Sequence, residues 1–366
     1  MNSILFFDPV CRYPYDTRTL QERATGGTEA SVTRVADALG ACVSQHNRTE
    51  VQGAYRPPGR IDGIEHVVVV RESRALPALR DLYPRARFYL WVHDQLNPGS
   101  KRARRLASTA ALLRELGVTV VCVSDTHRRN VEATLRSIGV AEQVRALTIY
   151  NPVDDSLVPD ARPIDARKLV FFSSPNKGLA YSLDVFRALR RRMPELTLTV
   201  GNPAYKVGKL ASSAGVQYLG PQPQSRIHEE VRSALCTLAP NFVLPETFGL
   251  VYAESRALGT PVLTHDCGAA AEVVGDPRQL LPVLRRYRAY ETAVGALPVG
   301  WRRGPARLAD RLGLFDAYLE RIAEWRAGAR PRVGPEPRFR TSQVAAQWRA
   351  LLDRSSSASS ASSASM

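Results

Sequence analysis

The stretch that decides the fold is Pro245-Glu246-Thr247-Phe248-Gly249-Leu250-Val251-Tyr252-Ala253-Glu254. An apolar run at residues 234–240, typical of a buried strand that ends at a proline, comes before it. Residues 250–258 have a short helical pattern, which Gly259 and Pro261 bring to an end. The order strand, loop, helix places the loop at the carboxyl end of a strand.

Two carboxylates flank the glycine of this stretch, with Glu246 just before the expected helix and Glu254 one to two turns inside it. A helix N-terminus favours anions such as phosphate, and Gly249 lets the backbone come close. At about 1.5 Å per residue the carboxylates are about 8–12 Å apart, which could straddle a diphosphate with a sugar on each side. Carboxylates suit sugar hydroxyls because each accepts several hydrogen bonds. The spacing alone, however, favours two solvated glutamates on a surface helix.

The neighbouring residues change that balance, because the whole run 234–276 resembles the donor site of the retaining glycosyltransferases of family 4, which have the GT-B fold. The family pattern is a glutamate, seven residues, a second glutamate, "G-x-P-V", and a glycine-rich turn before "E-V". It is present as Glu246, Phe248-Gly249-Leu250, Glu254, Gly259-Thr260-Pro261-Val262, Gly268 and Glu272-Val273. One departure is Ala269, which stands where the family usually has a second glycine.

Length and composition indicate a two-domain globular enzyme or binding protein. The chain has 366 residues, is 44% hydrophobic, and contains no apolar run long enough for a membrane span. The first residues predict a short strand without the basic region of a signal peptide. Five scattered cysteines argue against a disulfide framework or a zinc knuckle. We therefore expect a cytoplasmic protein, peripheral on the inner face of the membrane if it docks there.

The net charge of +15 implies an anionic partner, either nucleic acid, an anionic membrane or an acidic substrate, unless it reflects arginine-rich codon usage. The segment Asn97–Leu106 concentrates this charge, with Lys101, Arg102, Arg104 and Arg105 in five positions. It predicts either a solvated helix face or a basic amphipathic segment that docks on an anionic bilayer.

The first half of the chain predicts a doubly wound parallel sheet, because strands at 3–8, 66–70, 87–92, 118–123 and 144–149 alternate with helical patterns. Gly26 and Gly27 precede one of these helices, either as a second anion-binding turn or as a tight strand-to-helix turn. His93 and Asp94 follow a strand, where α/β sheets bind ligands. The resemblance implies that the glycines face the donor across a cleft and that His93 contacts the donor sugar.

A second cationic loop follows the strand at 168–172, in Ser173-Ser174-Pro175-Asn176-Lys177-Gly178. A lysine and a glycine in a strand-to-helix loop can hold a phosphate. The family has this "K-G", but Phe172 stands where it often has an arginine. Gly220 belongs to a segment that resembles the family's nucleobase-contacting loop. Adjacent Asp154 and Asp155 are poor metal ligands without a histidine or third acid nearby, and the run resembles the loop that closes the family's N-terminal domain.

These patterns divide the chain into four parts. We expect an N-terminal Rossmann-like domain at 1–160 and a nucleotide-sugar-binding Rossmann-like domain at 161–337. A terminal helix at 338–354 is expected to pack back on the first domain, and the Ser/Ala run 355–366 to be a disordered tail. The predicted fold class is α/β, GT-B, with an interdomain cleft.

The resemblance implies a retaining glycosyltransferase that moves a sugar from a nucleotide-diphosphate sugar to a glycan or lipid-linked acceptor, in cell-surface polysaccharide or lipopolysaccharide synthesis. It needs no metal and no cofactor, and nucleic acid is not an expected partner. The catalytic candidates are Glu246, Lys177 and His93. The donor-binding candidates are Gly26, Gly27, Asn176, Gly220, Thr247, Phe248, Gly249, Leu250 and Glu254. The alternatives are a basic polyanion-binding α/β protein without catalysis, and another GT-B enzyme such as a phosphorylase or sugar-nucleotide epimerase.

Overall fold

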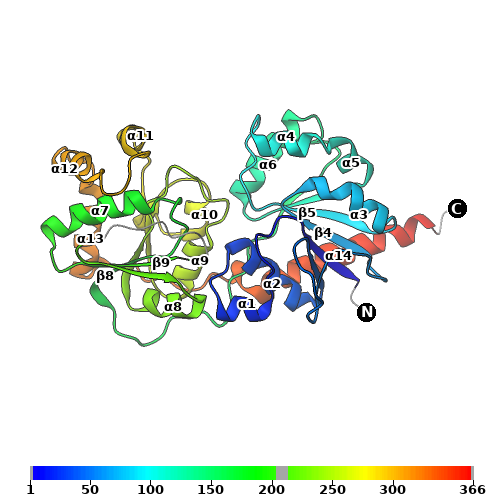
Figure 1. The fold of residues 1–366 in the computed structure, drawn as a ribbon, viewed down its shortest axis with the longest axis horizontal. Coiled ribbons are helices and arrows are strands. Elements are labelled where there is room, and N and C mark those ends of the chain that lie inside the picture. Colours follow the sequence, from blue (N-terminus) through cyan, green and yellow to red (C-terminus); the bar gives the residue numbers. More distant parts are fainter. Residues whose placement is uncertain (1–2, 203–212, 364–366) are drawn as a thin grey trace. The chain divides into compact units, whose positions relative to one another are not determined.

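The computed structural model describes residues 3–202 and 213–363 and divides the chain into two compact units (Figure 1). The N-terminal unit comprises Met1–Arg18, Gly27–Asp155 and Pro337–Met366, and the C-terminal unit comprises Thr19–Gly26 and Ser156–Glu336. Each unit is built on a parallel sheet with helices on both faces. The α/β class predicted from the sequence is confirmed.

The N-terminal unit contains a seven-stranded sheet in the order β3-β2-β1-β4-β5-β6-β7, in which every pairing is parallel. Its central strand β4 is buried at all five residues, because helices cover both faces. The strands are β1 (Ile4–Asp8), β2 (Cys42–Gln45), β3 (Tyr55–Arg56), β4 (His66–Val70), β5 (Arg87–Trp91), β6 (Thr119–Cys122) and β7 (Ala146–Thr148).

The helices of this unit lie on the two faces of the sheet, with α3 to α6 on one face and α2 and α14 on the other (Figure 1). The division of the chain into units falls within short α1, between Arg18 and Thr19. The helices are α1 (Thr17–Glu22), α2 (Gly27–Leu39), η1 (Ser73–Ala75), α3 (Leu76–Leu82), α4 (Lys101–Ala107), α5 (Ala110–Glu115), α6 (Asp125–Ser137), η4 (Pro337–Phe339) and α14 (Thr341–Ser363).

Strands β2 and β3 are absent from the sequence prediction. β2 has only four residues and includes buried Ser44 and Gln45, so it lacks the apolar run that marks the other strands. The buried Gln45 side chain is satisfied by the backbone of Tyr15, whose N–H donates to it and whose carbonyl accepts from it. Sequence patterns do not show such a partner thirty residues away.

The core of the N-terminal unit depends on its last helix. Trp348 of α14 is fully buried and makes edge contacts with Phe6 and Trp91, at ring-centroid distances of 5.8 and 5.1 Å. α14 also packs along α2, and Val153 forms a bridge with Arg340 just before it. The first strand, the fifth strand and the last helix therefore meet in one aromatic cluster.

The last helix is longer than the sequence suggests. We expected a helix over 338–354 and a disordered tail over 355–366, whereas α14 continues to Ser363. The physical reason for this correction is that the tail contains only serine, alanine and a final methionine, so neither glycine nor proline stops a helix that is already formed. Residues 364–366 of the predicted tail lie outside the described residues.

The C-terminal unit contains a six-stranded parallel sheet in the order β10-β9-β8-β11-β12-β13. Figure 1 shows α7 and α8 on opposite faces of this sheet. The strands are β8 (Asp165–Phe171), β9 (Thr197–Asn202), β10 (Val216–Pro221), β11 (Ala234–Leu238), β12 (Val262–His265) and β13 (Leu280–Leu281). The helices are α7 (Leu179–Arg192), α8 (Gln224–Arg232), α9 (Leu250–Ala257), α10 (Ala270–Val274), η2 (Pro277–Gln279), α11 (Arg285–Val294), α12 (Arg303–Arg311), α13 (Asp316–Glu324) and η3 (Trp325–Ala329).

A buried ion cluster fastens the arginine-rich helices of this unit to α7. The fully buried Arg302 donates from Nε to Asp184 of α7 at 2.7 Å, and its other nitrogens contact Glu291 and the carbonyl of Val294 on α11. Arg187 also pairs with Asp184, at 2.8 Å. Charges this deeply buried are tolerated only when paired and hydrogen-bonded, as they are here.

No helix within residues 3–202 and 213–363 is long and apolar enough to cross a membrane. This finding describes the helices of the two units only.

Trp348→Ala should strongly destabilise the N-terminal unit, because it opens a cavity against Phe6 and Trp91. We expect a loss of about 3–5 kcal/mol in the free energy of unfolding, measured by denaturant titration. The matched control is Trp301→Ala, since Trp301 is 75% exposed and should change stability by less than about 0.5 kcal/mol. Equal effects of the two substitutions would contradict the aromatic cluster.

Candidate active site

The most conspicuous site in the C-terminal unit lies where the strand order of its sheet reverses. Successive strands run from β8 towards β10 on one side, and from β11 towards β13 on the other. The loops that leave the carboxyl ends of β8 and β11 carry Lys177 and Glu246. Such a reversal opens a crevice between adjacent loops, which is where open α/β sheets bind ligands.

Lys177 is positioned by a tight turn that requires glycine next to it. Gly178 has a left-handed backbone, with φ of 97°, and a Cβ there would lie 3.0 Å from the carbonyl oxygen of Pro240. The Lys177 N–H donates to the carbonyl of Ser174 at 2.8 Å. Lys177 therefore stands directly before the N-cap of α7, where the positive end of the helix dipole adds to its charge.

Lys177 and Glu246 form an ion pair, with 2.8 Å between Nζ and Oε2. The two side chains differ in exposure, because Glu246 is 7% exposed whereas Lys177 is 40% exposed. The carboxylate is thus buried in the loop, while part of the lysine side chain faces solvent. A ligand could be bound by the open side of this cation without removing its internal partner.

The Glu246 backbone is held by a close contact with Gly268. The two residues form a parallel bridge, and the Ala269 N–H donates to the Glu246 carbonyl at 3.0 Å. A Cβ on Gly268, which has φ of 64°, would lie 2.5 Å from the Glu246 carbonyl oxygen and 2.9 Å from its nitrogen. The glycine of the turn before "E-V" is therefore needed so that the two loops can touch. Ala269, where the family usually has glycine, is fully buried.

Gly249 begins α9 with a left-handed backbone, at φ 89° and ψ 68°, and supplies no side-chain cap to the helix. A Cβ at this position would lie 2.5 Å from the ring of Tyr252. Burial, and then the charge of Glu246, raise the pKa of Tyr252. No side chain caps the start of α9, as in helix ends that bind an anion.

Glu254 lies buried in α9 and is 3.7 Å from Nε2 of His228 on α8. His228 belongs to α8, which begins at Gln224, and the sequence analysis assigned it no role. The two residues are 26 positions apart with no motif between them, so their pairing is visible only in three dimensions.

The remaining donor candidates of this unit occupy the same end of the sheet. Gly220 lies at the end of β10 with φ of 67°, and Thr247 and Phe248 fill the turn between Glu246 and α9. Phe172, at the position of the family's arginine, is a buried core residue. The C-terminal unit thus gathers nine of the predicted residues: Asn176, Lys177, Gly220, Glu246, Thr247, Phe248, Gly249, Leu250 and Glu254.

A cavity of about 600 Å³ borders the Lys177 loop. Its lining includes Asn176 and Gly178 from this loop, Asn241 and Phe242 from the loop after β11, and Arg288 of α11. Arg288 is a cation that sequence reasoning missed, and its charge also reaches Cys267, next to Gly268. It is a candidate for the cationic role that Phe172 cannot fill.

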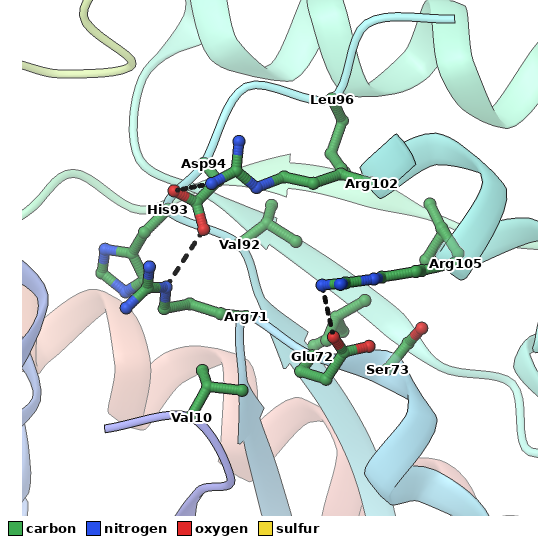
Figure 2. A pocket seen from close by; sticks show the side chains of 12 residues that line it. Val10, Arg71, Glu72, Ser73, Val92, His93, Asp94, Leu96, Arg102 and Arg105 are labelled. Atoms are coloured by element: carbon green, nitrogen blue, oxygen red, sulfur yellow. Dashed lines mark hydrogen bonds and ion pairs between the residues drawn. The ribbon is translucent and has the colours of Figure 1, made fainter. Parts of the chain in front are cut away.

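The N-terminal unit has an equivalent reversal between β1 and β4, and a cavity of about 130 Å³ lies at this end of its sheet (Figure 2). Asp94, which follows β5, is held between two arginines, Arg71 at 3.1 Å and Arg102 at 3.2 Å. On the other side of the cavity, Arg105 pairs with Glu72 at 3.3 Å. Among the lining residues, three guanidinium groups stand against two carboxylates.

Arg71 has an unusual backbone for a residue with a side chain, with φ of 68°. This left-handed conformation costs of order 1–2 kcal/mol, so the surrounding structure must impose it. The Arg71 N–H donates to the Trp91 carbonyl at 2.9 Å, which directs the residue across the end of the sheet. The carboxylates of Asp94, Glu29 and Asp8 stabilise its charge.

His93 lines the same cavity next to the guanidinium group of Arg71 (Figure 2). Burial, and then the charges of Arg71 and His127, hold the pKa of His93 well below its usual range, so the ring is neutral at pH 7. His127 connects the end of β6 to the loop that carries His93 and Asp94. Its Nδ1 accepts a hydrogen bond from the Val123 N–H, and its Nε2 lies 3.0 Å from the Asp94 carbonyl oxygen. These contacts assign the proton of His127 to Nε2.

The basic segment expected at 97–106 forms α4, and its arginines are not all directed to solvent. Arg102 and Arg105 pair with Asp94 and Glu72, and Arg104 donates to the Gly99 carbonyl. The pattern of the sequence could not show this, because both carboxylates lie earlier in the chain. Half of the basic cluster therefore belongs to the cavity.

The two glycines of the pair are assigned to different units. Gly27 begins α2 in the N-terminal unit, together with His93, whereas Gly26 is grouped with the C-terminal unit. No group of three or more His, Cys, Asp or Glu side chains within residues 3–202 and 213–363 has the arrangement of a metal site.

Gly268→Ala should displace Glu246, because the added methyl group meets backbone atoms that cannot rotate away. We compare it with Gly275→Ala, which also has a left-handed backbone but meets only the flexible end of Arg256, at 3.1 Å. Gly275→Ala should lose about 1 kcal/mol of unfolding free energy, and Gly268→Ala at least about 2 kcal/mol more. Similar losses, measured by chemical denaturation, would contradict the close backbone contact.

Known proteins resemble the part of the chain that carries this site. Residues 167–280 match the family model "Glycosyl transferases group 1". A D-inositol 3-phosphate glycosyltransferase of Nocardia farcinica is 37% identical over 106 residues, which are 29% of this chain and 22% of that protein. A phosphatidyl-myo-inositol mannosyltransferase of Mycolicibacterium smegmatis is 28% identical over 235 residues, 58% of each chain. The chain thus spans less than two thirds of both relatives.

Solved structures show the fold. The Anabaena protein Alr3699/HepE, in complex with UDP and glucose, has a TM-score of 0.61 at 17% identity, over 96% of this chain and 100% of that one. The pneumococcal O-GlcNAc transferase GtfA, in complex with UDP and GlcNAc, has a TM-score of 0.54 at 14% identity, over 79% and 56%. The GT-B fold predicted from the sequence is confirmed, and residues 167–280 match the model of the glycosyl transferases group 1 family.

Proposed function

We propose that this chain is a glycosyltransferase that moves a sugar from a nucleotide-diphosphate sugar to an acceptor. The observation that carries the proposal is the Lys177–Glu246 ion pair at the point where the strand order reverses, beside the uncapped start of α9. A cation, a helix N-terminus and a buried carboxylate together suit a diphosphate attached to a sugar. A site for phosphate alone would have no use for the carboxylate.

Each candidate residue has a role in this proposal. Glu246 accepts hydrogen bonds from the hydroxyls of the donor sugar, and Glu254 from those of the ribose. The N–H groups of Phe248, Gly249 and Leu250 bind the diphosphate. Asn176, Gly220 and Thr247 complete the donor pocket around them.

The reaction breaks the bond between C1 of the sugar and the diphosphate oxygen, and forms a bond from C1 to an acceptor oxygen. Negative charge develops on the leaving diphosphate, where Lys177 and the α9 N-terminus stabilise it, and the acceptor proton passes to that diphosphate. Arg288 supplies the second cation, so that the reaction needs no metal. Neutral His93 donates a hydrogen bond to the sugar. Attack on the face that the diphosphate leaves retains the configuration at C1, as in family 4.

The cavity of the N-terminal unit supports an acceptor that carries a phosphate. Arg71, Arg102 and Arg105 surround a space of about 130 Å³, and a phosphate suits such a set of guanidinium groups. The names of both curated relatives include a phosphorylated or phosphatidyl inositol. We therefore propose an inositol phosphate or a related phosphorylated polyol, free or lipid-linked, as acceptor. A role in cell-surface polysaccharide or lipopolysaccharide synthesis stays a prediction.

The donor site is tested by thermal unfolding with UDP, GDP, ADP, CMP and dTDP, without added metal. One nucleotide should raise the melting temperature of the wild type, and much less that of Glu254→Ala. Lys177→Met should lower kcat by about 10²–10³-fold. Lys168→Met is the matched control, because Lys168 also pairs with a glutamate, Glu230, away from these loops. No response to any nucleotide would contradict the proposal.

The acceptor site is tested by comparing inositol 3-phosphate with inositol in a transfer assay, using the donor found above. Arg71→Gln should raise KM for the phosphorylated acceptor by about 10-fold or more and leave inositol unaffected, because only the phosphate needs the cation. Arg74→Gln is the control, since Arg74 pairs with Glu72 on the same segment but does not line the cavity. Equal effects on both acceptors would place the phosphate elsewhere.

A further inference from the structure

The surface of α12 and the loop before it departs from the usual pattern of a globular protein. Trp301, Leu308 and Leu312 are 75%, 60% and 73% exposed. The side of α12 that faces the core of the C-terminal unit carries the small residues Ala306 and Ala309 instead, which let the helix pack closely on α7. An ordinary surface helix buries its large apolar side chains and exposes its small or polar ones. Here the large side chains are directed outwards.

The exposed apolar residues form one stripe. Leu308 lies on α12, and Leu312, the C-cap residue, follows it by four residues, so that the two side chains lie about 40° apart around the helix axis. Trp301 lies in the turn just before α12 and is the third exposed apolar residue of this surface. Pro305, which is partly exposed, falls on the same side. The stripe continues into the loop before the helix, because residues 292–301 carry no charged side chain and Ala296 and Pro298 are exposed.

A basic stripe runs alongside the apolar one. Arg303, Arg307 and Arg311 are exposed and lie at successive turns of α12, at about 160°, 120° and 80° in that order from the midpoint between Leu308 and Leu312. The acidic residue of this helix, Asp310, is buried and already pairs with Arg191 and Arg192 of α7. Glu291 of neighbouring α11 likewise pairs with Arg302. The acids of both helices are therefore neutralised, and the exposed face stays positive.

We propose that α12 and the loop 296–301 dock the protein on an anionic lipid surface. The apolar stripe enters the boundary between headgroups and acyl chains, and the arginines bind the lipid phosphates. The tryptophan beside the stripe is the residue type that prefers this boundary. The positive charge of this surface favours an anionic lipid surface over a second copy of the chain. A second copy of the chain, placed symmetrically on the stripe, would bring like arginine stripes together.

This docking surface differs from the one expected from the sequence at 97–106. Two of the four basic residues of that segment pair with carboxylates of the N-terminal cavity, whereas the α12 arginines Arg307 and Arg311 stand beside exposed leucines. The proposal concerns lipid binding and does not depend on the identity of the sugar donor. It would bring the enzyme to acceptors that are attached to lipid.

The tryptophans of the chain provide a direct probe. Of the four, Trp91, Trp325 and Trp348 are buried and only Trp301 is exposed. With vesicles of an equimolar mixture of phosphatidylcholine and phosphatidylglycerol, the emission of the wild type should shift to shorter wavelength. Vesicles of phosphatidylcholine alone should leave it unchanged. Trp301→Phe should still sediment with the anionic vesicles and lose the spectral shift. A shift that persists in Trp301→Phe would overturn the proposal.

Charge and apolar variants test the two stripes separately by vesicle co-sedimentation. Arg307→Glu with Arg311→Glu should weaken binding by at least about 30-fold. Arg114→Glu with Arg136→Glu, an equal charge change on exposed helices of the N-terminal unit, should leave binding nearly unchanged. Leu308→Glu should weaken binding, and Val51→Glu, at a similarly exposed residue, should not.

Three outcomes would overturn the proposal. One is equal binding, or none, to neutral and anionic vesicles. Another is anionic binding that both α12 variants retain, which would place the docking surface elsewhere. The third is the absence of vesicle binding together with another use of the surface. Such a use would be a wild-type dimer that Leu308→Glu converts to a monomer, or oligonucleotide binding that Leu308→Glu abolishes. Thermal unfolding of every variant excludes a loss of structure as the cause.

Discussion

The ion pair between Lys177 and Glu246 is the interaction on which the donor site depends, because it joins the loops that leave β8 and β11. These strands are neighbours in the sheet, and their following helices diverge to opposite sides. The pair therefore forms across the reversal of strand order. Gly178 and Gly268 make it possible, since each allows a backbone approach that a side chain would block. The absence of a side chain at these two glycines thus determines where the Glu246 carboxylate lies.

The local features of the site can be predicted from short stretches of sequence. Its contacts between residues far apart in the chain cannot. The strand at 234–240, the glycine that begins α9 and the Lys177-Gly178 loop have patterns that extend over a few residues, so the sequence predicts them well. The partner of Glu254, His228, lies on another helix and is marked by no spacing. The same holds for Arg288, which enters the donor region from α11.

The arginines of this chain have three different environments, although the sequence presents them as one basic excess. Arg302 is fully buried and fastens α11 and α12 to α7. Arg71, Arg102 and Arg105 surround a cavity in which carboxylates already neutralise part of their charge. Arg307 and Arg311 lie on an exposed surface. Net charge is thus a poor guide to binding, because only arginines without a dedicated internal carboxylate remain available to an anionic partner.

The packing of Trp348 against Phe6 and Trp91 has a consequence for the order in which the protein matures during synthesis. The ribosome makes β1 and β5 first and α14 only after the whole C-terminal unit. Phe6 and Trp91 of the first sheet therefore stay uncovered until Trp348 has been synthesised. The C-terminal unit, apart from the short segment Thr19–Gly26, is continuous and can fold as it emerges. Chaperones that bind exposed aromatic surfaces during translation should therefore act on the N-terminal half of the nascent chain.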